Sequence, residues 1–196
     1  MRSTPEEAFA VAQASIARRD WRAFFACFDR DDLCRAAEDG VPSYLSVFGR
    51  DEWFLEHCLT HGVRLEDLDV WEQGRRAVER AGVPGRRRSG GATMMGGNPA
   101  FGLSDAQRRL VDSASEAMRS ALAQVRVPEA FVGDMIARVQ SAGRGGALPS
   151  TLFLGETLES VRVDGDRARA TRTVRGAPVA ELEFVRRNGE WVVHLA

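Results

Sequence analysis

The sequence contains no lysine, so all 27 of its basic residues are arginine. The arginines are balanced by 28 acidic residues, and the formal net charge is −1. A chain without net positive charge has no overall field that attracts nucleic acid or anionic lipid, and we expect neither partner. The missing lysine indicates a G+C-rich coding sequence, and we expect a bacterial protein. Selection for bidentate anion binding by arginine would not explain the absence of lysine from the whole surface.

Cysteine is also scarce, with three residues at Cys27, Cys34 and Cys58. The N-terminal residues lack the apolar stretch of a secretory signal, because acidic residues follow almost at once. No segment approaches the roughly 18 apolar residues that a membrane span needs. We therefore expect reduced thiols in a cytoplasmic protein that does not bind membranes.

Helical periodicity covers most of the chain before its last quarter. It runs from Thr4 to about residue 80 and again from about residue 104 to residue 143. Between these stretches, about residues 82–103 are rich in glycine and contain three consecutive arginines. We predict a flexible loop there, since the segment has little to bury and no phosphate-binding motif. The length of 196 residues fits one domain with a sizeable core, and we predict a single domain over residues 1–196.

Residues 150–196 predict an antiparallel β-meander. Asp164–Gly165 and Asn188–Gly189 are dipeptides that favour two-residue hairpin turns, because both central residues of such a turn adopt positive φ. We prefer a three-residue turn at residues 176–178, since it keeps the apolar side of the sheet continuous. The resulting partners are Arg186 with Trp191, Phe184 with Val193, Glu183 with His194, Ala170 with Phe184, Arg172 with Leu182, Val161 with Ala168, and Glu159 with Ala170.

This register gives the sheet two unlike faces. The apolar face is predicted to pack against helices and contains Val161, Val163, Ala168, Ala170, Val174, Ala180, Leu182, Phe184, Trp191, Val193 and Leu195. The second face is predicted to be solvated and carries Arg169, Thr171, Thr173, Glu181, Glu183 and His194. Glu159 and Arg172 are charged residues on the apolar face, where they would be diagonal neighbours. The predicted fold class is α+β, with a helical N-terminal two-thirds packed on the C-terminal meander.

Four short segments carry a resemblance to a known fold. They are Thr-Pro-Glu-Glu-Ala at residues 4–8, Arg-Asp-Trp at residues 19–21, and the strand sequences Val-Asp-Gly-Asp-Arg-Ala and Leu-Glu-Phe-Val-Arg-Arg-Asn-Gly-Glu-Trp-Val-Val-His-Leu. Over about residues 1–40 and 157–196 the chain resembles the NTF2-like (SnoaL-like) superfamily. The resemblance implies a curved sheet around an N-terminal helix, with a pocket between them, and often a dimer. The middle of the chain would be a helical insertion, where the superfamily usually has a short strand or two.

A ligand site is predicted on the apolar face of the sheet. Glu159 and Arg172 would orient a small polar or anionic ligand on a wall that includes Phe184 and Trp191. The alternative is a structural ion pair, or an arginine that extends past the edge of the sheet.

Two further sets of residues are candidates for chemistry. His57 and His61 are four residues apart, which places both on one helical face at a spacing that can bind zinc. A third ligand would have to come from Glu52, Glu56 or His194, so we predict neither a metal centre nor a cofactor. Glu183 could orient His194 as a general base, but a surface pair explains this pattern better, since the face is expected to be solvated and has no nucleophile nearby.

No motif in the sequence identifies a reaction. We predict a non-catalytic binding or protein-interaction module, with a small apolar or anionic ligand, a protein partner or a second copy as its partner. The reason is that the middle of the apolar face contains no His, Asp, Cys or Tyr. One alternative is a small-molecule enzyme of isomerase, cyclase or dehydratase type, with Asp29, Asp31, Asp32 or His57 as its acid–base residue. The other is an immunity or accessory protein that binds its partner through the helical middle.

Overall fold

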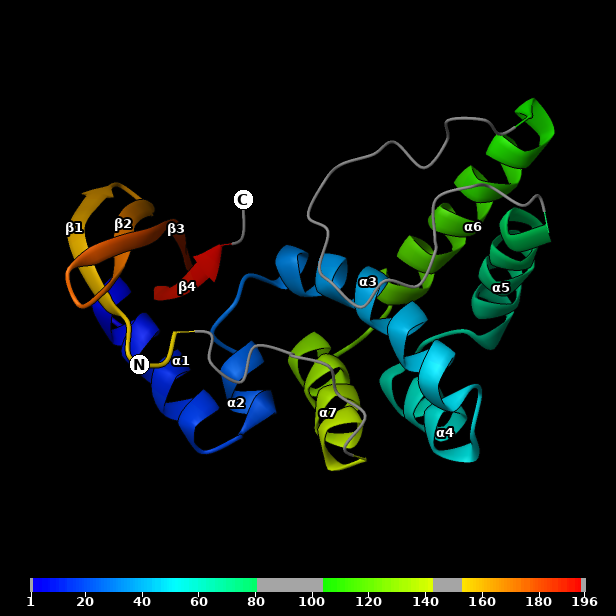
Figure 1. The fold of residues 1–196 in the computed structure, drawn as a ribbon, viewed down its shortest axis with the longest axis horizontal. Helices are drawn as coiled ribbons and strands as arrows, with labels where there is room; N and C mark the ends of the chain where they lie inside the picture. The colour runs from blue at the N-terminus through cyan, green and yellow to red at the C-terminus, as the bar shows by residue number, and fades with distance from the viewer. Residues whose placement is uncertain (1, 81–103, 143–152, 195–196) are drawn as a thin grey trace. The chain divides into compact units, whose positions relative to one another are not determined.

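The fold is that of a computed structural model, which describes residues 2–80, 104–142 and 153–194. These residues form helices and one C-terminal antiparallel sheet (Figure 1), so the α+β class is confirmed. The helices are α1 (Pro5–Ala17), α2 (Trp21–Phe25), α3 (Arg30–Phe48), α4 (Glu52–His61), α5 (Leu65–Arg80), α6 (Asp105–Ala123) and α7 (Pro128–Ser141). The strands are β1 (Thr157–Asp164), β2 (Arg167–Val174), β3 (Ala177–Arg187) and β4 (Glu190–His194). The predicted loop at 82–103 lies outside the described residues.

The chain divides into two compact units. Unit 1 comprises Met1–Glu52 and Arg126–Ala196, and unit 2 comprises Trp53–Val125. Unit 2 contains almost all of α4 together with α5 and α6, and the last two pack against each other. The prediction of one domain stays a prediction. Among the described residues, no helix combines the length and the apolar character needed to cross a membrane.

Helix α1 begins as its sequence predicts. Thr4 is the N-cap, and its hydroxyl accepts a hydrogen bond from the Glu7 backbone N–H at 3.2 Å. Pro5 occupies the first helical position, where its missing N–H costs nothing. The Glu7 carboxylate accepts from the Ser3 N–H at 2.6 Å, which satisfies a second backbone donor at this end.

The strands follow one another in the order β1-β2-β3-β4. The prediction for the last hairpin is confirmed: Arg186 lies opposite Trp191, Phe184 opposite Val193, and Glu183 opposite His194. Asn188 and Gly189 form its turn, and both have positive φ.

The predicted three-residue turn at residues 176–178 is wrong. Val174 pairs with Ala177, so the turn consists of Arg175 and Gly176, which both have positive φ. A register shift between Arg172 and Thr173 follows. The pairs Ala170–Leu182, Ala168–Phe184 and Arg172–Ala180 replace those that were predicted.

The register predicted for β1 is also wrong: the turn is displaced by one residue, so Val163 rather than Val161 lies opposite Ala168, a shift of two residues. Asp164 belongs to the strand and pairs with Arg167, which leaves Gly165 and Asp166 as the turn. A bulge between Glu159 and Arg162 then shifts the register again, and Ser160 has a φ of 55° there. Glu159 consequently lies opposite Thr171 and faces away from the apolar side of the sheet.

The core of unit 1 lies between the sheet, α1, α2 and the segment that follows α2. Phe153 is near its centre, with ring centroids 5.0 Å from Phe9, 6.1 Å from Phe24 and 6.2 Å from Phe28. The buried members from the sheet are Ala168, Ala170, Leu182, Phe184, Trp191 and Val193, all predicted. Val163 and Val174 were predicted for this face but are 58% and 39% exposed, because they lie at the ends of their strands. The second face is not uniformly solvated, since Thr173, Val185 and Val192 are buried.

Candidate functional site

The segment after α2 runs beside β4 and places the start of α3 against the sheet. Phe28 forms a parallel bridge with Val193. The Asp29 N–H donates to the Val193 carbonyl at 2.8 Å, and the Val193 N–H donates to the Cys27 carbonyl at 2.7 Å. Because these two bonds fix the chain on both sides of Phe28, the first turn of α3 lies next to the last strand.

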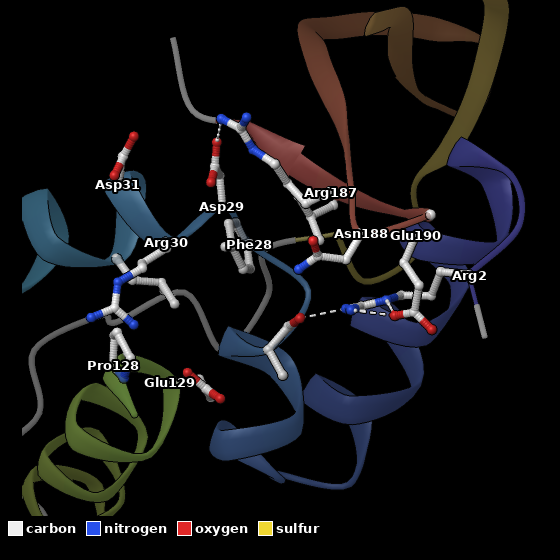
Figure 2. A pocket seen from close by; sticks show the side chains of 14 residues that line it. Arg2, Phe28, Asp29, Arg30, Asp31, Pro128, Glu129, Arg187, Asn188 and Glu190 are labelled. Atoms are coloured by element: carbon white, nitrogen blue, oxygen red, sulfur yellow. Dashed lines mark hydrogen bonds and ion pairs between the residues drawn. The ribbon is translucent and has the colours of Figure 1, made fainter. Parts of the chain in front are cut away.

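An open depression lies on the second face of the sheet, in unit 1. Its volume is about 830 Å³. Apolar side chains in its lining are Ala26, Phe28, Leu33, Pro128 and Val192, and its polar or charged residues are Arg2, Asp29, Arg30, Asp31, Glu129, Arg187, Asn188 and Glu190. Figure 2 shows the residues of α3 and α7 on one side and those of the β3–β4 hairpin on the other. We call this region the charged depression.

One wall of the charged depression is an ion pair between sheet and helix. Arg187 Nη2 donates to Asp29 Oδ2 at 2.8 Å (Figure 2), and the Asp29 side chain is only 6% exposed. Burial alone would raise the pKa of Asp29, but the hydrogen bond and charge of Arg187 outweigh it and lower the pKa below its usual 3.8. The same contact raises the pKa of Arg187. Asp29 is therefore a fixed anion at neutral pH.

A second ion pair is formed near the N-terminus of the chain. Arg2 donates through Nε and Nη2 to Glu190 Oε2, at 3.2 and 2.9 Å, and its guanidinium also contacts the Ala26 carbonyl (Figure 2). The Arg2 carbonyl accepts from the Trp191 N–H at 2.9 Å. The hydrogen bond and charge of Arg2 lower the pKa of Glu190. The two ends of the described chain are thereby held together at the rim.

A buried carboxylate, Asp32, lies beside the depression. Its side chain is 1% exposed, and Oδ2 accepts a hydrogen bond from His194 Nδ1 at 3.0 Å. Arg35, one turn further along α3, forms an ion pair with its other oxygen. The atoms of Asp29, Asp32 and His194 that could bind a metal all lie within 4.8 Å of one another. Since Arg187 and Arg35 already neutralise both carboxylates, this cluster has no charge deficit that calls for a cation.

The predicted pair of Glu159 and Arg172 is wrong. Arg172 contacts Glu156, with its Nη1 3.4 Å from Glu156 Oε2, and its guanidinium lies 5.2 Å from the centre of the Phe153 ring. Glu159 accepts from the Thr173 hydroxyl at 3.0 Å. The bulge in β1 explains the difference, because it moves Glu159 to the face opposite Arg172.

The predicted aromatic residues of that wall are core residues. Phe184 is fully buried and Trp191 is 4% exposed, and both belong to the hydrophobic core of unit 1. A ligand would reach them only by displacing other core side chains. The role of Glu159, Arg172, Phe184 and Trp191 in ligand binding stays a prediction.

The histidines of α4 lie on one helical face, as their spacing predicts. The His57 ring is 4.6 Å from that of His61, and Trp53 stacks on His57 at 4.5 Å with a tilt of 14°. His57 is buried and His61 is partly exposed. The candidacy of His57 and His61 as metal ligands stays a prediction.

The predicted partners on the second face, Glu183 and His194, are neighbours but contact other residues. Glu183 pairs with Arg169 at 2.8 Å, whereas His194 bonds to Asp32.

Asp29, Asp31 and Asp32 are the acid–base candidates of the sequence, and the fold brings Asp29 and Asp32 to His194. Arg2, Arg187 and Glu190 were not singled out from the sequence. Arg187 and Glu190 flank the Asn188–Gly189 turn, which is the one signal that could have found them.

Comparison with protein-family models, with curated proteins and with solved structures found no match for this chain.

Proposed function

We propose that this protein is a non-catalytic binding module that takes a basic segment of a partner polypeptide into the charged depression. The observation that carries the proposal is the uneven pairing of charges there. The lining of the depression contains three arginines and four carboxylates. Arg187 is engaged by Asp29, and Arg2 is engaged by Glu190.

Two carboxylates of the depression are available to a ligand. Asp31 is in the first turn of α3 and Glu129 is in the first turn of α7. Among the contacts of the described residues, neither carboxylate forms an ion pair, and Figure 2 shows them apart from each other, with the Arg30 side chain between them. Basic side chains of a partner segment could each bind one of these carboxylates, while apolar side chains of the segment contact Pro128 and Leu33.

The electrostatics of the site favour binding over acid–base catalysis. A general base works best with a pKa near the pH at which it operates. The Arg187 contact lowers the pKa of Asp29, which makes this carboxylate a weak base. The apolar face of the sheet is filled by aromatic and aliphatic side chains, which supports an interaction module over an enzyme with a pocket between sheet and helices.

The test starts with peptides selected from a random displayed library against the purified chain, and affinities are measured by calorimetry. We expect selected peptides to share a basic residue, and Asp31→Ala with Glu129→Ala to weaken binding at least about tenfold. Glu181→Ala removes an exposed carboxylate of β3 and is the matched control, with unchanged affinity. If no peptide is selected, or if the double variant binds as well as the control, the proposal fails.

A small-molecule enzyme is the second candidate, and one observation favours it. Asp32 holds His194 through Nδ1, which leaves Nε2 as the nitrogen for proton transfer. A bell-shaped pH profile for turnover of any screened substrate, abolished by His194→Gln, would establish this candidate.

The third reading, an immunity or accessory protein, is a version of the binding proposal in which the partner is a specific bacterial protein. The NTF2-like fold, the bacterial cytoplasmic setting and self-association belong to the proposal as well.

A further inference from the structure

The outer edge of the sheet is formed by β1. The opposite edge is closed, because Phe28 bridges to β4. Within the described part of unit 1, β1 is hydrogen-bonded to β2 on one side and has no neighbouring strand on the other. Six of its eight residues are exposed, and Val163 is 58% exposed. An edge of this kind presents backbone N–H and C=O groups that can pair with another strand.

The bulge in β1 gives this edge an unusual symmetry. In a regular strand, residues an odd number of positions apart point to opposite faces. The shift between Glu159 and Arg162 changes that relation. Leu158 lies opposite Arg172 and Val163 lies opposite Ala168, so both belong to the apolar face. Glu159 and Arg162, opposite Thr171 and Arg169, both belong to the second face.

We propose that β1 pairs antiparallel with β1 of a second copy, around a two-fold axis between Ser160 and Val161. Residues whose numbers sum to the same value then face each other across the axis. Leu158 lies opposite Val163 of the partner subunit, and Glu159 lies opposite Arg162 of the partner subunit. Each contact occurs twice, so two apolar pairs and two ion pairs form together.

Charge complementarity identifies the second copy as the occupant. Glu159 and Arg162 carry opposite charges at positions that exchange under the two-fold rotation. A strand of another sequence would match both charges only if it also had an acidic residue three positions before a basic one. A bulge alone often protects an edge from pairing. Here it also brings the apolar and charged residues of β1 into self-complementary positions.

The expected dimer is weak and depends on concentration, because a single pair of short strands buries less than a standard interface of roughly 1,600 Å². The proposal concerns the edge of the sheet away from β4 and is independent of the charged depression. Sedimentation velocity of the full chain from about 10 μM to about 1 mM covers the affinities that an interface of this size allows. We expect the sedimentation coefficient to rise across this range.

Charge reversal provides the decisive variants. Glu159→Arg alone and Arg162→Glu alone each place like charges opposite one another, and we expect each to weaken association about tenfold. The double variant restores both ion pairs and should associate within about threefold of the natural chain. Glu181→Arg reverses an exposed charge on β3 and should leave association unchanged. A chain that stays monomeric over the whole range overturns the proposal, and so does a double variant that associates no better than the single ones.

Discussion

Gly133 on α7 lies against the backbone of α2, and adding one methyl group there tests the packing that positions the charged depression. A Cβ at this position would lie 2.9 Å from the Arg22 backbone nitrogen and 3.0 Å from the Arg22 Cα. These atoms belong to the main chain, so no side chain can rotate away. The two helices would have to separate by about half an ångström to reach ordinary contact distances. Since α7 also carries Pro128 and Glu129, that movement reaches the depression.

The magnitude follows from a comparison with Gly40, which lies inside α3 and has nothing within 4 Å of its added Cβ. Gly→Ala inside a helix stabilises by about 1 kcal/mol through propensity alone. That gain applies to both Gly133→Ala and Gly40→Ala and cancels in their difference. What remains is the cost of overpacking at Gly133, about 1–3 kcal/mol.

Thermal unfolding followed by circular dichroism measures the difference. For a chain of this size, a cost of about 1–3 kcal/mol corresponds to a melting temperature roughly 2–12 °C lower for Gly133→Ala than for Gly40→Ala. Gly40→Ala should melt slightly above the natural chain. If the two variants shift the melting temperature by the same amount and in the same direction, the close approach of α7 to α2 is refuted.

Two further predictions concern acidic residues at the start of α3, Asp29 at its N-cap position and Asp32 in its first turn. Asp29 has a lowered pKa in the folded state, so its stabilising contribution is present above the unfolded pKa of about 4 and is lost as the pH falls through the folded value. The melting temperature of the natural chain should therefore fall more steeply between about pH 5 and pH 2 than that of Asp29→Asn, and parallel curves would contradict this. His194→Ala removes a hydrogen bond from buried Asp32 and should cost about 1–3 kcal/mol in urea unfolding, whereas Glu181→Ala should cost under about 0.5 kcal/mol; equal costs would show that His194 is not a partner of Asp32.

The last hairpin was predictable in detail because its information is local. Asn188–Gly189 fixes a two-residue turn. Residues at equal distances from the turn along the two strands then lie opposite each other. The face of Glu159 was not predictable in the same way. Its placement depends on Gly165–Asp166 forming the turn and on one extra residue near Ser160. Moving the turn by one residue shifts the pairing by two and keeps each side chain on its face, whereas the extra residue shifts the pairing by one and moves Glu159 to the other face.

The charged depression depends on contacts that no local pattern describes. Arg2 and Glu190 are 188 positions apart, and Asp32 and His194 are 162 apart. Residue type suggested Asp29, Asp31 and Asp32 as chemically capable side chains. Their neighbours follow from the parallel bridge between Phe28 and Val193, which exists only once the whole sheet has formed.

That bridge also sets the order in which the protein can mature during synthesis. The segment around Phe28 emerges from the ribosome well before its partner Val193, which lies 165 positions further along the chain (193 − 28). At about 5–20 residues per second, translating residues 53–125 alone takes roughly 4–15 s. During this interval α1 and α2 have no sheet to cover, and the apolar side chains of Phe9, Phe24 and Phe28 are without their final neighbours. The charged depression can therefore form only after β4 has been made, and a chain that is interrupted earlier lacks the wall that Glu190 and Val192 provide.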